Sequence, residues 1–158
     1  MAEVTFRVAT ADDSELVLAF IKELAKYEKL ENEVVATKEL LDKWLFEENK
    51  AEVIFAVVSG KEVGFALFFS TFSTFLGRPG IHLEDLYVSP EYRGLGYGRA
   101  ILKKLSQITV QRDYGRLEWW CLNWNQPSID FYKSLGAQTM DEWTDYRLSG
   151  KELEDLAK

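Results

Sequence analysis

Hydrophobic positions follow two different periods along the first half of this chain. Apolar residues recur at three- and four-residue steps over residues 11–30, and again after Thr37, a plausible N-cap. This spacing places them on one face of a helix, so we expect two helices there. Runs rich in Val, Ile and Phe predict three strands, over residues 4–9, 52–58 and 62–70, the last two joined as a hairpin.

In the second half, one predicted strand leads directly into a glycine-rich turn and a helix. Residues 82–88 alternate, and Ser89-Pro90 ends the strand because proline has no N–H for a ladder. Helical spacing then begins at Tyr97 and continues to about residue 112. The other expected elements are a loop over 71–80, a strand over 117–122, a helix over 128–135, short strands over 138–143 and 144–148, and a helical tail after Ser149.

The order of these elements predicts an α/β fold. Strands and helices are interspersed along the chain, which favours a mixed central sheet with helices on both faces. A length of 158 residues is typical of one domain, so we expect residues 1–158 to form a single domain.

Composition argues against several classes of protein. A single cysteine, Cys121, cannot form an internal disulfide, and with only one histidine it argues against a metal site. No apolar run approaches the roughly 20 residues that span a bilayer, and the N-terminus lacks the features of a signal peptide. We therefore expect a cytoplasmic protein that does not enter a membrane. A net charge of −7 argues against nucleic acid as a partner and is compatible with a cationic substrate.

The glycine-rich turn has the composition of an anion site. Arg93 is followed by Gly94, Gly96 and Gly98, and the helix begins among them. The first N–H groups of a helix have no internal partner, and glycines allow the backbone to approach a phosphate closely. The spacing lacks the Gly-Lys-Ser/Thr ending of a P-loop and the G-x-G-x-x-G of dinucleotide-binding folds. A strand-to-helix turn that binds no ligand would have the same local pattern.

The pattern Arg93-x-x-Gly96-x-Gly98 after a strand resembles the pyrophosphate loop of the GNAT family of N-acetyltransferases. A second segment, residues 125–137, resembles another motif of that family, N-x-x-[AS]-x-x-[FL]-Y-x-x-x-G-[FA]. The resemblance implies the GNAT fold, with a sheet that splays at the cofactor site, and acetyl-CoA as co-substrate without a metal.

Within this family the chain resembles the diamine acetyltransferases, which acetylate spermidine and spermine. The likeness runs along nearly the whole chain and is carried by residues 21–28, 83–85, 92–94, 101–103 and 127–129. It implies a homodimer with the active site close to the subunit interface. The cofactor-binding residues that it implies are Leu86, Tyr87, Val88, Arg93, Gly94, Leu95, Gly96, Tyr97, Gly98, Arg99, Asn125, Gln126, Pro127, Ser128 and Tyr132.

Further residues carry the expected amine chemistry. Glu84 is the candidate base, because a carboxylate in a partly closed cleft can hold an ammonium and then accept its proton. Tyr132 is the candidate acid for the leaving thiolate, and the resemblance implies that Tyr27 and Glu28 receive the amine. Glu84 could instead form only a surface ion pair, and Tyr132 could serve only in packing. Asp85 is expected on the opposite face of a regular strand, unless a bulge alters the alternation.

The substrate is left open between several classes. The predicted activity is transfer of acetyl from acetyl-CoA to a primary amine of a polyamine or diamine, by direct attack in a ternary complex. Residues 72–77 contain no carboxylate where the human-type enzymes have one, which leaves room for a lysine-like amine such as thialysine. The sequence also allows a protein acetyltransferase or a non-catalytic acyl-CoA sensor, although the sensor would not need Glu84 or Tyr132.

Overall fold

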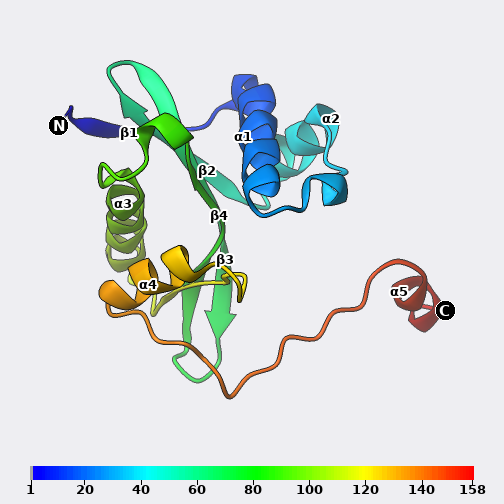
Figure 1. Ribbon diagram of the computed structural model, residues 1–158. Coiled ribbons are helices and arrows are strands. Elements are labelled where there is room, and N and C mark those ends of the chain that lie inside the picture. Colours follow the sequence, from blue (N-terminus) through cyan, green and yellow to red (C-terminus); the bar gives the residue numbers. More distant parts are fainter. Residues whose placement is uncertain (1) are drawn as a thin grey trace. The chain divides into compact units, whose positions relative to one another are not determined.

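The computed structural model describes residues 2–158, which form two compact units that divide between Trp120 and Cys121. The first unit contains every strand found in the described residues (Figure 1). The strands are β1 (Val4–Val8), β2 (Glu52–Val58), β3 (Lys61–Ser73), β4 (Arg78–Val88) and β5 (Leu117–Trp119).

The helices are distributed over both units. The first unit has α1 (Ser14–Tyr27), α2 (Lys38–Leu41), which continues as a π-helical stretch over Asp42–Glu47, and α3 (Tyr97–Gln111). Short 3₁₀ turns occupy Ala11–Asp13, Glu31–Glu33 and Pro90–Tyr92. The second unit has α4 (Gln126–Ser134) and α5 (Gly150–Leu156).

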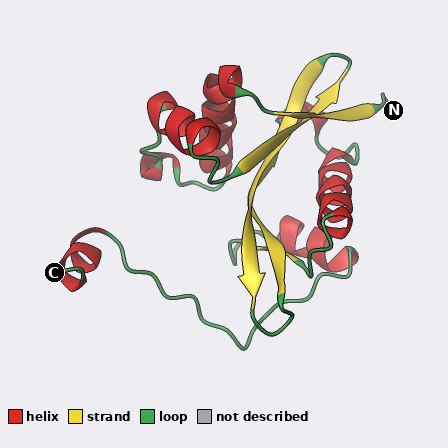
Figure 2. Ribbon diagram, turned by 180° about the vertical axis from the view of Figure 1, so that it is seen from behind, coloured by secondary structure: helices red, strands yellow, loops and turns green. Residues whose placement is uncertain are grey.

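The sheet is mixed, and two of its strands separate along their length. Its order is β1-β2-β3-β4-β5, with antiparallel pairs up to β4 and a parallel pair between β4 and β5. That parallel pairing covers only Ile81–Leu83 against Leu117–Trp119, so the part of β4 from Glu84 to Val88 is unpaired on the β5 side. In Figures 1 and 2, α1 and α2 cover one face of the sheet and α3 covers the other. The predicted mixed sheet with helices on both faces, splayed at one point, is confirmed.

Aromatic side chains pack α1 against the sheet. Phe20 of α1 stacks on Phe65 of β3 with ring centroids 5.2 Å apart, and it also contacts Phe55 and Tyr87. These four side chains are buried together with Val17. Burying each large apolar side chain stabilises the fold by about 1.5–3 kcal/mol, so this cluster holds α1 firmly over β2, β3 and β4.

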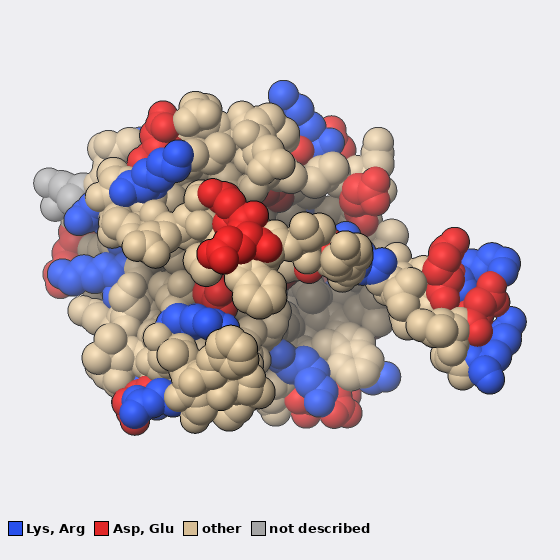
Figure 3. Space-filling view, turned by 90° about the horizontal axis from the view of Figure 1, so that it is seen from below, with Lys and Arg blue, Asp and Glu red and all other residues tan. Residues whose placement is uncertain are grey.

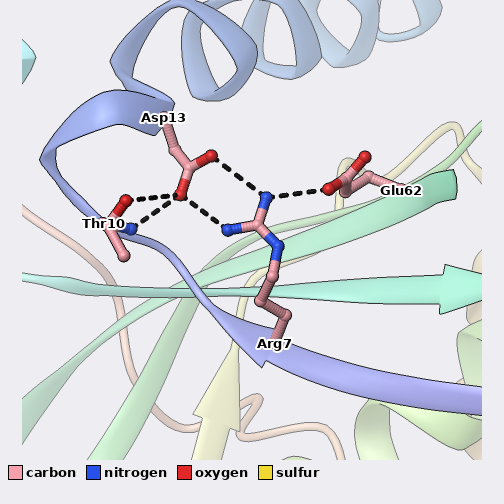
Figure 4. Close-up of polar contacts among 4 residues, drawn as sticks. All are labelled: Arg7, Thr10, Asp13 and Glu62. Carbon is pink, nitrogen blue, oxygen red and sulfur yellow. Dashed lines mark hydrogen bonds and ion pairs between the residues drawn. The ribbon is translucent and has the colours of Figure 1, made fainter. Parts of the chain in front are cut away.

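The start of α1 is fixed by a charged network, shown in Figure 4. The guanidinium of Arg7 donates to Asp13 at 2.8 Å and to Glu62 at 2.8 Å, which links β1, α1 and β3. The N–H of Thr10 donates to the Asp13 carboxylate at 2.7 Å, in agreement with the capping pattern of the sequence. Hydrogen bonds from Arg7 hold the pKa of the Asp13 carboxyl below its ordinary range.

The predicted loop over residues 71–80 is wrong for most of its length. β3 continues to Ser73 and β4 begins at Arg78, so only residues 74–77 form the turn. Pro79 lies opposite Phe72 in this pairing, and its carbonyl accepts a hydrogen bond from Gly115 at 2.8 Å. A proline lacks only the N–H, so it can remain in a strand whose carbonyl is hydrogen-bonded.

The two short strands predicted over residues 138–148 are also wrong. The structure shows only a turn at residues 141–142 within this segment, and its side chains are exposed. A strand needs a second strand to supply its backbone hydrogen-bond partners, and none of the described strands pairs with this segment. The strand predicted over 117–122 ends early, at Trp119, whereas the helical tail is confirmed as α5.

Candidate active site

The glycine-rich turn forms an open backbone loop at the start of α3. Gly94 and Gly96 have φ values of 75° and 87°, a conformation that L residues with a Cβ adopt only at a cost. Gly96 precedes the first residue of the helix, Tyr97. A Cβ built on Gly94, Gly96 or Gly98 would have no neighbouring atom within 4 Å. The loop thus leaves room for a phosphate group beside the helix N-terminus, which fits the pyrophosphate of acetyl-CoA.

The backbone of β4 beside this loop faces the open edge of the sheet. The N–H of Ser89 donates to the Val63 carbonyl of β3 at 2.8 Å. Because backbone groups alternate in direction along a strand, those of Val88 and Leu86 point the other way, toward the splay. Binding of an extended amide-bearing chain by Leu86 and Val88 stays a prediction.

Arg93 joins this edge to the end of α1. Its Nε donates to the Val88 carbonyl at 2.8 Å. Its guanidinium carbon lies 5.1 Å from the ring centroid of Tyr27 and 5.0 Å from that of Tyr87. The side chain of Arg93 therefore connects the candidate cofactor loop with Tyr27, a candidate amine-binding residue.

A β-bulge lies where β4 and β5 separate. Leu67 of β3 pairs with Asp85, while the next residue, Phe68, pairs with Leu83, so Glu84 is the extra residue of β4. A bulge breaks the strict alternation of side chains along a strand. The expectation that Asp85 faces away from Glu84 assumed a regular strand, so it does not apply at this bulge.

Asp85 is the functional candidate that the sequence reasoning missed. Burial, followed by the charges of Glu84 and Glu28, raises the pKa of its carboxyl from an ordinary 3.8 to about 7. Burial and the charge of Glu84 also raise the pKa of Glu28. The three carboxyls thus act on one another electrostatically, although Glu28 comes from the end of α1. The sequence carried one signal of this kind, two adjacent carboxylates at the end of a strand before the glycine loop.

Glu84 is the more exposed member of this group and has its own partner. Its Oε2 lies 3.5 Å from Nε2 of His82, two residues earlier on β4. The His82 ring packs between Phe69 and Trp120, with centroid distances of 5.1 and 5.2 Å. His82 thus contacts two aromatic rings and lies close to the Glu84 carboxylate.

The second unit contains the remaining predicted site residues. The Asn125 side chain accepts a hydrogen bond from the N–H of Ser128 at 3.4 Å and so caps α4, with Pro127 in its first turn. Gln126 donates to Asp130 at 2.7 Å, and the Tyr132 ring lies 5.6 Å from that of Phe131. Gly136, with φ of 86°, follows the helix as predicted. The roles of these residues toward a cofactor stay predictions.

Charge and composition of the described residues limit the chemistry. Both acidic and basic side chains are exposed on the face shown in Figure 3. Within residues 2–158 no group of His, Cys, Asp and Glu is arranged to hold a metal ion. In the same residues no helix has the length and apolar character needed to cross a bilayer.

Comparison with known proteins identifies the family. The acetyltransferase (GNAT) family model matches residues 18–137. The chain is 37% identical to the pig thialysine N-epsilon-acetyltransferase, over 99% of both chains. It is 33% identical to human spermidine/spermine N(1)-acetyltransferase-like protein 1, over 96% of this chain and 23% of that protein. An integron cassette protein from V. cholerae superposes with a TM-score of 0.82 and 31% identity, over 100% of this chain and 99% of that one.

The splayed sheet, the glycine loop and these matches agree. This chain belongs to the GNAT family and is an acetyl-CoA-dependent N-acetyltransferase. Its relatives act on amines, as their names state, and this is the coarse function that the comparisons support.

Proposed function

We propose that this enzyme acetylates the side-chain amine of a lysine-like amino acid of the thialysine type. The observation that carries the proposal is the group of interacting carboxyls, Glu28, Glu84 and Asp85, beside the open edge of β4. The turn at residues 74–77 adds no carboxylate to it, as expected for a substrate shorter than spermine. The full-length likeness to a thialysine acetyltransferase supports the same choice.

The chemistry requires an amine without its proton, although a free alkylamine has a pKa of about 10. In the proposed reaction Glu28, Glu84 and Tyr27 hold the ammonium, through ion pairs and contact with an aromatic face. A carboxylate of the Glu84–Asp85 pair then removes one proton, directly or through water. Asp85 is the better acceptor of the two, because its raised pKa lies near neutral pH.

The transfer itself forms one bond and breaks another. The amine nitrogen bonds to the acetyl carbon, and the bond from that carbon to sulfur breaks. Before the carbon–sulfur bond breaks, the thioester carbonyl oxygen becomes an oxyanion, and the N–H of Leu86 stabilises it. The thiolate takes a proton from the Tyr132 hydroxyl. The nitrogen still carries one extra proton after the attack, and its release, directly or through water, restores that hydroxyl. Because the amine attacks the thioester directly, no acyl-enzyme is formed.

Acetyl-CoA supplies the activated acetyl group when it is bound. The residues proposed to hold it along the pantetheine arm are Leu86, Tyr87 and Val88. Those proposed around the pyrophosphate are Arg93, Gly94, Leu95, Gly96, Tyr97, Gly98 and Arg99. From the second unit the proposal includes Asn125, Gln126, Pro127, Ser128 and Tyr132, as the family resemblance implies.

A polyamine or diamine is the second candidate substrate. The same three carboxyls would suit a chain with several ammonium groups, and the human relative's name refers to spermidine and spermine. The comparisons favour the lysine-like amine, since the full-length match is to a thialysine enzyme.

We also infer that the enzyme is a homodimer. The resemblance to diamine acetyltransferases implies it, and exposed aromatic side chains in the second unit support it. Trp143 is 75% exposed and Tyr146 is 90% exposed. We expect a dimer by light scattering and more monomer after the paired change Trp143→Ser and Tyr146→Ser. Val110→Ser, an equally exposed position on α3, is the matched control; a monomeric wild type would contradict the inference.

The decisive experiment measures thiol release from acetyl-CoA with thialysine, lysine, spermidine and putrescine. Faster turnover with thialysine than with spermidine supports the proposal, and the reverse order supports the polyamine. Acetyl-CoA binding without turnover on any of these amines would overturn both, and it would leave a protein substrate or a sensor. The variants Glu84→Gln and Asp85→Asn identify which carboxylate the reaction needs.

A further inference from the structure

Arg93 makes contacts within the protein that phosphate binding alone would not require. Its Nε is committed to the Val88 carbonyl, at the end of β4. The flat guanidinium group meets two aromatic rings, Tyr27 at the end of α1 and Tyr87 within β4. Arg93 itself lies one residue before Gly94, so it ties the glycine loop to both elements.

The end of α1 has a second connection to the same place. The Tyr87 hydroxyl donates to the Glu23 carboxylate at 3.3 Å. Glu23 and Tyr27 are four residues apart and so share one face of α1. Arg93 contacts Tyr27 and Tyr87 binds Glu23, so both residues hold the same face of α1 at its last turn.

This last turn carries the residues proposed to bind the amine. The N–H groups of Glu28 and Leu30 donate to the carbonyls of Leu24 and Ala25, at 2.9 and 2.8 Å, and Lys29 has a positive φ of 61°. Such a cap ends the helix immediately after Tyr27 and fixes the direction in which Glu28 leaves it. Any movement of this turn against β4 would displace Glu28 relative to Glu84 and Asp85.

We propose that Arg93 is a positioning residue that couples the cofactor loop to the amine site, by holding Tyr27 and Glu28 against the end of β4. The inference rests on the proposed amine site at Glu28. Coenzyme A bound along the loop and the β4 edge strengthens these contacts of Arg93, and Arg93 so held places Glu28 for the amine. By linkage, the amine tightens coenzyme A binding by the same factor.

The chemistry of the guanidinium explains why arginine serves here. Its planar group can donate an N–H within its plane to the Val88 carbonyl while its faces meet the two rings. A lysine ammonium offers the positive charge but no plane. The variant Arg93→Lys therefore keeps the positive charge and removes the planar geometry.

The test is a calorimetric cycle with coenzyme A and thialysine. We expect the Kd of thialysine to fall about fivefold when coenzyme A is saturating. In Arg93→Lys we expect the Kd of coenzyme A to change by less than about threefold and the coupling to fall below about twofold. Arg93→Met should lose the coupling as well. The matched control is Arg99→Met in the same loop, which should weaken coenzyme A binding without changing the coupling factor.

A second readout does not need an amine. Hydrogen exchange of residues 24–30 should slow on addition of coenzyme A to the wild type and should not slow in Arg93→Lys. The proposal is overturned if both variants weaken coenzyme A binding but keep the wild-type coupling and exchange, since Arg93 would then serve the cofactor alone. If no amine binds the wild type, the proposed function fails, and the exchange result still decides the role of Arg93.

Discussion

Burial and then the charge of the adjacent Glu84 raise the pKa of the Asp85 carboxyl at a β-bulge of β4. Leu67 pairs with Asp85 and Phe68 with Leu83, which leaves Glu84 as the extra residue. Glu84 is half exposed and contacts His82, whereas Asp85 is partly buried and has the raised pKa. The bulge gives two carboxylates of the same strand different environments, and different environments permit different roles.

The first prediction separates these two roles by kinetics. Asp85→Asn should lower kcat by about 100-fold, because it removes the proton acceptor while keeping the shape of the side chain. Glu84→Gln should mainly raise the KM of the amine, by about tenfold, since one ion pair is lost. Steady-state rates with acetyl-CoA and thialysine provide the measurement. A large loss of kcat in Glu84→Gln with near-normal Asp85→Asn would instead make Glu84 the base.

The pH dependence of activity gives a second prediction. A base with a pKa of about 7 is protonated in acid, so kcat/KM should rise with pH through that value in the wild type. Asp85→Asn should lose this limb of the profile, while Tyr27→Phe, which keeps the aromatic face, should retain it. A limb that is unchanged in Asp85→Asn would assign the titration to another group.

The same carboxyl predicts how stability depends on pH. The folded protein keeps Asp85 protonated up to about pH 7, whereas the unfolded chain ionises it near its ordinary pKa of 3.8. The fold therefore loses stability as the pH rises from about 4 through 7, by as much as about 4 kcal/mol. Asp85→Asn should raise the Tm at pH 8 relative to wild type and leave it nearly unchanged at pH 4. An equal effect at both pH values would show that ionisation is not the cause.

The glycine loop yields a prediction with its control in the same loop. Gly96→Ala should destabilise the protein by about 1–2 kcal/mol, because Gly96 has a φ of 87°. It should also weaken coenzyme A binding, since the loop must shift. Gly98 lies in the first turn of α3 without a positive φ, so Gly98→Ala should be neutral or stabilising in thermal unfolding. Equal destabilisation by the two changes would contradict the backbone argument.

Tyr132 provides a prediction for the second unit. Tyr132→Phe keeps the ring and removes the hydroxyl, so we expect the Kd of coenzyme A within about threefold of wild type and a kcat lower by tenfold or more. Calorimetry and steady-state rates measure the two quantities separately. A raised KM for acetyl-CoA with an unchanged kcat would mean that Tyr132 only packs against the cofactor.

Local patterns in the sequence determined much of the fold. The boundaries of β2 agree with the prediction at both ends, and α3 begins at Tyr97 as expected, because period and capping act over only a few residues. The glycine loop was recognised from the sequence for the same reason: the positive φ values of Gly94 and Gly96 are a local requirement of the turn. These local features were enough to indicate the family.

Only the tertiary structure decided the features that depend on pairing between distant segments. The bulge at Glu84 is set by the register of β3 against β4. The pKa of Asp85 is raised first by burial under other segments, then by the charges of Glu84 and of Glu28, which is far away in the sequence. The contact of Arg93 with Tyr27 likewise joins a loop to a helix that the chain reaches much earlier. Residues 138–148 were predicted as two strands but have no partner among the described strands. A strand, a pKa shift and a shared site each need a second segment, and the period of one segment does not specify which other segment will lie beside it.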